Sequence, residues 1–123
     1  MWNGAGGEPL PLIALEAPCL LRTLACEHLD RHGLSWRIAF VSPSLGGLWA
    51  ATVAGLGIGV QTPIGLPSSV GMLEAAGHGL PSSPSLGLML RRSDRGPSPL
   101  VDDLAAAIRQ ALRETRDDAW LPP

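Results

Sequence analysis

Apolar residues recur along the chain in two alternating patterns: short continuous runs, and stretches with helical spacing. The almost wholly apolar run Leu10–Leu15 predicts a strand that is covered on both faces. Trp36–Val41 is rich in aromatic and β-branched residues, and Ile58–Thr62 is a short apolar run that ends before a proline. Both segments therefore predict further short strands.

Two helices are predicted between these strands. Pro18 fits the first turn of one helix, whose apolar residues recur at helical spacing. Gly33 can adopt the left-handed backbone conformation that ends this helix. Hydroxyl caps from Ser42-Pro43-Ser44 begin the second helix, and Gly55 and Gly57 end it. The order β-α-β-α-β favours parallel strands joined by right-handed crossovers, and therefore an α/β fold. The apolar face of the second helix consists of Leu45, Leu48, Trp49, Thr52, Val53 and Leu56.

The last part of the chain has a different pattern. Residues 64–84 hold many Gly, Pro and Ser residues with weak periodicity, which predicts a connector. Ser85–Arg91 is strand-like, and Pro99–Thr115 predicts a helix with acidic residues in its first turn and arginines in its last. The apolar stripe of this helix needs a partner surface and consists of Leu100, Leu104, Ile108 and Leu112.

Composition narrows the classes of function. The chain has 123 residues, which suits one domain, and its net charge of −2 gives no electrostatic footprint for nucleic acid or an anionic membrane. All nine basic residues are arginine, so chemistry that needs a lysine is excluded. We expect no membrane span and no signal peptide, and the two free cysteines, Cys19 and Cys26, fit a reducing, cytoplasmic compartment.

Signals for catalysis or metal binding are weak. His28 and His32 lie four residues apart near Cys26, but no second cluster supplies further ligands, so we interpret them as solvated residues of a polar helix face. His78 stands alone in the connector. The glycine-rich run Gly55–Gly59 closes a helix and opens a strand, the reverse of a dinucleotide-binding loop, and predicts a tight turn with close backbone packing. We predict no catalytic residues, no metal and no cofactor.

The segment Val41–Gly47 is the most informative one, because a strand there leads directly into a helix. The first N–H groups of that helix have no partner within the helix, and such a terminus attracts anions. The hydroxyls of Ser42 and Ser44 can bind a carboxylate or phosphate there, or they can simply cap the helix. Glu16–Cys19 follows the first strand, so it would line the same edge of a parallel sheet.

The order of these segments and their amino-acid sequences resemble the effector-binding domain of LysR-type transcriptional regulators. The similarity covers roughly residues 2–112. It is carried by Pro9–Leu15, Cys19–Arg22, Trp36–Leu48, Ala50–Val60, Gly79–Pro81, Leu86–Arg91 and Pro99–Leu112.

The resemblance implies a specific organisation of the chain. Members of that family carry a winged helix-turn-helix and a two-subdomain effector domain, related to periplasmic (type 2) binding proteins, with the ligand held between the subdomains. We expect a three-layer parallel-sheet unit that forms one such lobe. The implied segments are a lead or hinge over 1–9, the second subdomain with its βαβαβ core over 10–63, a connector over 64–84, the return strand and helix of the first subdomain over 85–115, and a tail over 116–123.

The resemblance also implies partners and contact residues. It implies a small-molecule effector, a dimer, and DNA contact only through a winged-helix segment that this sequence does not contain. An acidic residue in the site, Glu16, suits an amine-bearing or neutral effector unless it points away from the ligand. The implied ligand contacts are Glu16, Pro18, Cys19, Ser42, Pro43, Ser44 and Leu45.

The leading hypothesis is a ligand-sensing regulatory domain without catalytic activity, in a chain that is a fragment of a longer regulator. The alternative is a solute-binding protein of a transport system with the same fold. Transport would require secretion, which free cysteines fit less well.

Overall fold

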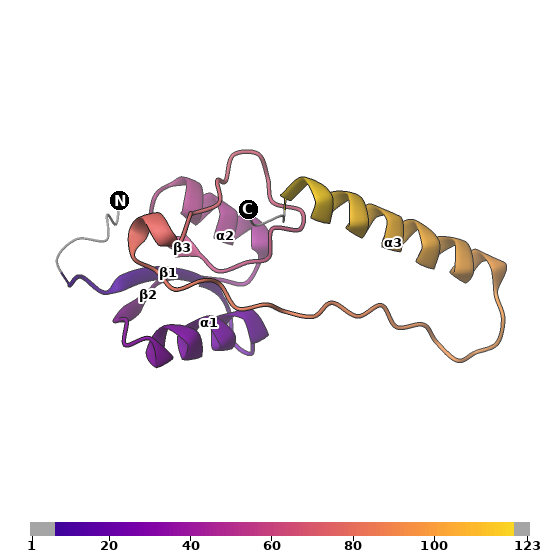
Figure 1. The fold of residues 1–123 in the computed structure, drawn as a ribbon, viewed down its shortest axis with the longest axis horizontal. Coiled ribbons are helices and arrows are strands. Elements are labelled where there is room, and N and C mark those ends of the chain that lie inside the picture. Colours follow the sequence, from indigo (N-terminus) through magenta and orange to yellow (C-terminus); the bar gives the residue numbers. More distant parts are fainter. Residues whose placement is uncertain (1–6, 120–123) are drawn as a thin grey trace. The chain divides into compact units, whose positions relative to one another are not determined.

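A computed structural model describes residues 7–119 of the chain (Figure 1). The predicted lead over 1–9 and tail over 116–123 therefore lie partly outside the described residues. The chain divides into two compact units: β1 to η1 belong to the first, and the second holds α3 together with Ser85–Gly96 and Pro63–Gly65. The elements are β1 (Leu10–Leu15), α1 (Leu20–Arg31), β2 (Trp36–Ser42), α2 (Leu45–Val53), β3 (Ile58–Gly59), the short 3₁₀ helix η1 (Ala76–His78) and α3 (Pro99–Ala119).

The first unit is built on a parallel sheet of three strands in the order β2-β1-β3. The register of β1 against β2 runs from Leu10 opposite Trp36 to Leu15 opposite Ser42, with a shift after Leu12. On its other edge, β1 pairs with β3, where Ile13 lies opposite Gly59. The predicted α/β class with parallel strands is confirmed.

Helices cover both faces of the central strand (Figure 1). Leu10 and Leu12 of β1 pack with Leu29 of α1 on one face. Ile13, which is fully buried, packs with α2 on the opposite face, against Leu48. Successive residues of a strand point to opposite faces, so a strand covered on both sides must be apolar throughout. This arrangement explains the continuous run Leu10–Leu15.

The glycine-rich run after α2 forms a tight turn, as predicted. Gly55 has φ 75°, and the N–H groups of Gly55 and Leu56 donate to the carbonyls of Thr52 and Ala51 at 3.0 and 3.1 Å, which closes the helix in a Schellman motif. Gly57 then passes close to β1, because a Cβ there would lie 2.5 Å from the carbonyl oxygen of Pro11. The close backbone packing expected for this run is confirmed.

Several boundaries in the first unit differ from the prediction, and the smallest difference is at the end of β2, which extends by one residue to Ser42. Pro18 lies outside α1, which begins at Leu20, because Cys19 is extended (φ −140°, ψ 117°) and forms the N-cap. The third strand covers only Ile58–Gly59 instead of 58–62. Its pairing with β1 ends where the N–H of Val60 donates to the carbonyl of Ile13. The second helix ends at Val53, so Leu56 lies beyond it in the turn and is half exposed.

The second unit consists of α3 and the extended segment before it. The strand predicted over 85–91 is absent: this segment pairs with no strand in the described part of the chain, and Leu88 and Met89 are 67% and 82% exposed. A strand requires a neighbour to receive its backbone hydrogen bonds. The predicted helix is present and extends four residues further, to Ala119.

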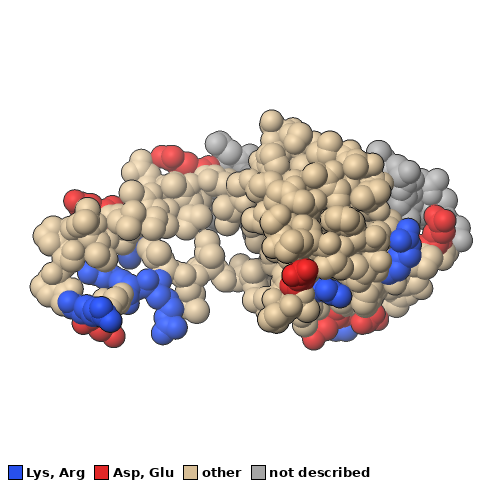
Figure 2. Space-filling model, turned by 180° about the vertical axis from the view of Figure 1, so that it is seen from behind, with Lys and Arg blue, Asp and Glu red and all other residues tan. Residues whose placement is uncertain are grey.

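The start of α3 matches its sequence signals. The Ser98 hydroxyl accepts from the N–H of Val101 at 3.4 Å, and Arg92 forms an ion pair with Asp102 in the first turn. Figure 2 shows basic side chains gathered over the segment that leads into α3, while most of the visible face is neither acidic nor basic. The predicted apolar stripe is only partly covered, since Leu100 is 78% and Leu104 58% exposed.

Candidate functional site

The two segments that hold the predicted site residues both begin at the carboxyl edge of the sheet. Leu15 and Ser42 are the last paired residues of β1 and β2, and the N–H of Glu16 donates to the carbonyl of Ser42 at 3.0 Å. The segments Glu16–Cys19 and Ser42–Leu45 therefore begin side by side. Glu16, Pro18 and Leu45 are exposed. In a parallel sheet this edge is where ligands bind, beside the point at which successive connections leave in opposite directions.

The hydroxyl of Ser42 is committed to the local backbone. Ser42 is only 2% exposed, its Oγ donates to the carbonyl of Ser44 at 2.8 Å, and it accepts from the N–H of Ser44 at 3.2 Å. These bonds hold the chain in the bend between β2 and α2. The Ser42 side chain therefore stabilises the junction between β2 and α2, and it is buried below the surface of the predicted site.

Ser44 caps α2 and leaves donors free. Its backbone is extended (φ −137°, ψ 154°), and its Oγ accepts from the N–H of Gly47 at 3.2 Å. The N–H groups of Leu45 and Gly46 donate to no group in residues 7–119. With the hydroxyl proton of the exposed Ser44, they form a small set of hydrogen-bond donors at the positive end of the helix dipole.

Gly47 is required by the packing of this junction. A Cβ at Gly47 would lie 2.2 Å from Oγ of Ser42, whereas a Cβ at the neighbouring Gly46 would meet nothing within 4 Å. The first turn of α2 therefore lies directly on the buried Ser42 hydroxyl. The composition of the segment 41–47 alone did not reveal this close packing.

Gln61, which sequence reasoning missed, belongs to the same edge. It follows β3 by two residues, and its side-chain nitrogen is buried without a hydrogen-bond partner in the described residues. Its neighbour Val60 packs on the α1 face of the sheet, so alternation along an extended chain assigns Gln61 to the α2 face. The strand order could have revealed it, because β3 ends beside β1.

Of the two helix histidines that were predicted to be solvated, His32 is exposed, whereas His28 is partly buried. The rings of His28 and His32 lie 4.5 Å apart between centroids, and Nε2 of His28 is buried with no partner among the described residues. Nδ1 of His32 lies 2.8 Å from the carbonyl oxygen of His28. Within residues 7–119, no group of three or more His, Cys, Asp or Glu side chains is arranged to hold a metal ion.

Cys26 lies in the cluster between α1 and the sheet, where it packs with Leu29. Burial raises the pKa of its thiol above the ordinary value of 9.0, with Asp30 acting in the same direction and Arg22 opposing both. Cys26 is therefore a packing residue, and its thiol is less readily ionised than a free one.

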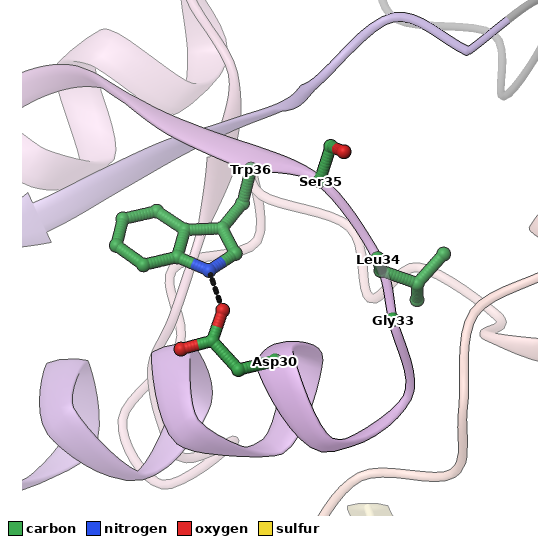
Figure 3. Close-up of a pocket in the computed structure, with 5 residues that line it drawn as sticks. All are labelled: Asp30, Gly33, Leu34, Ser35 and Trp36. Carbon is green, nitrogen blue, oxygen red and sulfur yellow. Dashed lines mark hydrogen bonds between the residues drawn. The ribbon is translucent and has the colours of Figure 1, made fainter.

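A hollow of about 410 Å³ lies at the opposite, amino edge of the sheet (Figure 3). It is formed where α1 turns into β2, and the indole N–H of Trp36 donates to Oδ1 of Asp30 at 2.8 Å. None of the predicted ligand contacts lines this hollow. The residues around it are Asp30, Gly33, Leu34, Ser35 and Trp36.

Comparison with known proteins gives the chain its functional context. No family model matches it. The HTH-type transcriptional regulator DgdR of Burkholderia cepacia is 32% identical over 118 residues, which cover 91% of this chain and 40% of that protein. The HTH-type transcriptional regulator PecT of Dickeya dadantii (strain 3937) is 31% identical over 107 residues, which cover 87% of this chain and 34% of that protein.

The chain is similar to HTH-type transcriptional regulators. It spans less than half the length of these two relatives. Both relatives are named as transcriptional regulators. No helix in residues 7–119 combines the length and apolar character needed to cross a bilayer.

Proposed function

We propose that this chain is the ligand-sensing part of a LysR-type transcriptional regulator. The similarity to two HTH-type regulators over nearly the whole chain supports this proposal most strongly. The order of segments described above adds the LysR assignment, in which residues 10–63 form the second subdomain and residues 85–115 return to the first. DNA contact would belong to a winged-helix segment, and the regulator would act as a dimer in the cytoplasm.

The effector would bind at the carboxyl edge of the sheet. Leu45 and Gly46 offer free N–H groups there, and Ser44 adds a hydroxyl proton. Pro18, Cys19 and Pro43 would form the walls beside these donors, and the buried Ser42 would hold the junction in shape. Binding would act as a signal by favouring one arrangement of the regulator over another, with no chemical change in the ligand.

Glu16 limits the class of effector. It is exposed, and its backbone is tied to Ser42, so its carboxylate stands at the same edge as the donors of α2. A simple organic acid would be attracted by the donors and repelled by Glu16. A ligand that carries both an amino group and a carboxylate, such as an amino acid, would satisfy both.

Binding at this edge can be tested by NMR on the 123-residue chain. We expect glycine to shift the backbone amide signals of Glu16, Leu45 and Gly46 in a saturable way, and Ser44→Ala to weaken binding about three- to tenfold through loss of one hydrogen bond. Ser98→Ala, which removes a cap from α3 instead, is the matched control. Saturable shifts confined to other parts of the chain would contradict the proposed site.

The regulatory role can be tested in the source organism. Deletion of the coding gene is expected to change a limited set of transcripts, measured by RNA sequencing, and reintroduction of the gene should restore them. A transcript profile that the deletion leaves unchanged under all growth conditions tried would contradict a regulatory function.

A further inference from the structure

The side chain of Gln61 presents a buried amide nitrogen with no hydrogen-bond partner in residues 7–119. A buried donor that has lost its water and gained no partner destabilises the fold. Buried polar groups are nearly always satisfied, so an exception of this kind requires an explanation. Either another side chain should replace it without harm, or the donor has a partner that comes from outside the chain.

Three observations place residue 61 near the carboxyl ends of β1 and β2, where the proposed effector site lies. Ile13 lies opposite Gly59, and the N–H of Val60 donates to the carbonyl of Ile13, so Gln61 follows directly where β3 leaves β1. Val60 packs on the α1 face, which assigns Gln61 to the α2 face by alternation. Leu15, two residues beyond Ile13, packs on this α2 face and lies opposite Ser42.

We propose that the side-chain amide of Gln61 donates a hydrogen bond to a carboxylate or carbonyl oxygen of the effector. The inference rests on the proposed function and names a third recognition point, on the β3 side of β1. The donors of α2 lie on the β2 side and Glu16 lies between them at the end of β1. A ligand at the end of the central strand would thus meet groups from all three strand ends.

This role predicts opposite effects of one substitution on stability and on binding. Gln61→Leu removes a buried donor that has no internal partner, so the melting temperature should stay the same or rise. The same change should weaken glycine binding by about fivefold or more. If Gln61 served only the fold, the substitution would lower the melting temperature. That result would overturn the proposal.

NMR can observe the amide group itself. The chain contains one Asn and two Gln residues, Asn3, Gln61 and Gln110, so its spectrum holds three side-chain amide pairs, and the Gln61→Leu spectrum identifies the one that belongs to Gln61. Glycine should shift that pair, and methylammonium, which has no acceptor, should not. Gln110, whose amide already donates to Glu114 on α3 at 3.1 Å, is the internal control.

The outcomes separate this inference from the proposed function. If glycine shifts the backbone amides of Leu45 and Gly46 while the Gln61 pair stays fixed and Gln61→Leu binds like the wild type, the role of Gln61 is wrong and the effector site stands. If glycine shifts none of these signals, both are wrong. A Gln61 pair that moves no more than the Gln110 pair also overturns the inference.

Discussion

At the scale of single residues, two adjacent glycines in the first turn of α2 have very different surroundings. A Cβ at position 47 would overlap Oγ of Ser42, and a Cβ at position 46 would stand in open space. Both positions are helical, so the intrinsic effect of alanine on the helix is the same at each. Any difference between the two alanine variants must therefore come from contact with Ser42.

We expect Gly47→Ala to destabilise the fold by about 1–3 kcal/mol, because the overlap would displace the buried serine or the first turn of α2. Gly46→Ala should be neutral or slightly stabilising, since alanine is favoured over glycine in a helix. Urea denaturation followed by circular dichroism measures both changes. Equal stabilities for the two variants would show that the junction is not closely packed.

The raised pKa of the Cys26 thiol gives a prediction for pH. In a Cys19→Ser variant, alkylation by iodoacetamide should accelerate only at a higher pH for the folded chain than for the same chain in urea. As pH rises, the thiol ionises first in the unfolded chain. The contribution of Cys26 to the free energy of unfolding is therefore complete below its ordinary pKa of 9.0, and it is lost as pH rises through the pKa of the folded state. Identical pH profiles in both states would refute this.

At the scale of elements, α2 is held to the sheet mainly through its inner face. Leu48 is 1% exposed and packs on Ile13, while Leu56, just beyond the helix, is 50% exposed. Leu48→Ala should lower the free energy of unfolding by about 2–5 kcal/mol, and Leu56→Ala by much less. Thermal denaturation of the two variants, which remove the same atoms, measures the difference. Comparable losses would indicate that α2 does not pack as described.

The sequence predicted elements well where one local pattern decided them. The apolar run of β1 and the glycines that close α1 and α2 were sufficient, because burial and turn geometry are local constraints. The predicted strand over 85–91 failed because a strand depends on a neighbour, which no local pattern can supply. Gln61 was missed for a related reason: its place beside β1 follows from the strand order, and its lack of a partner is visible only in three dimensions.

At the scale of the whole molecule, the second unit exposes a large amount of apolar side chain. Leu88, Met89, Leu100 and Leu104 are all more than half exposed. Large exposed apolar surface favours association, so we expect the chain to form dimers or larger species at tens of micromolar. Sedimentation velocity at several concentrations tests this, with Leu100→Gln/Leu104→Gln as the variant that should weaken assembly. A monomer at every concentration would contradict the prediction.

The charge of the chain also has a consequence for DNA. With a net charge of −2, the 123-residue chain should show no sequence-specific shift of duplex DNA in a mobility assay at physiological salt. Only non-specific binding, weaker than about 1 μM, is expected. A tight shift that depends on the DNA sequence would mean that these residues themselves read DNA.

The central position of β1 imposes an order on biosynthesis. This strand leaves the ribosome before both of its neighbours, and the pairing residue Gly59 of β3 follows only after α1, β2 and α2. At a synthesis rate of roughly 5–20 residues per second, the nascent chain carries an apolar, aggregation-prone strand with an unpaired edge for about two to nine seconds. During that time it is a natural target for chaperones, and a charged substitution in Leu10–Leu15 that improved its solubility would sacrifice the core.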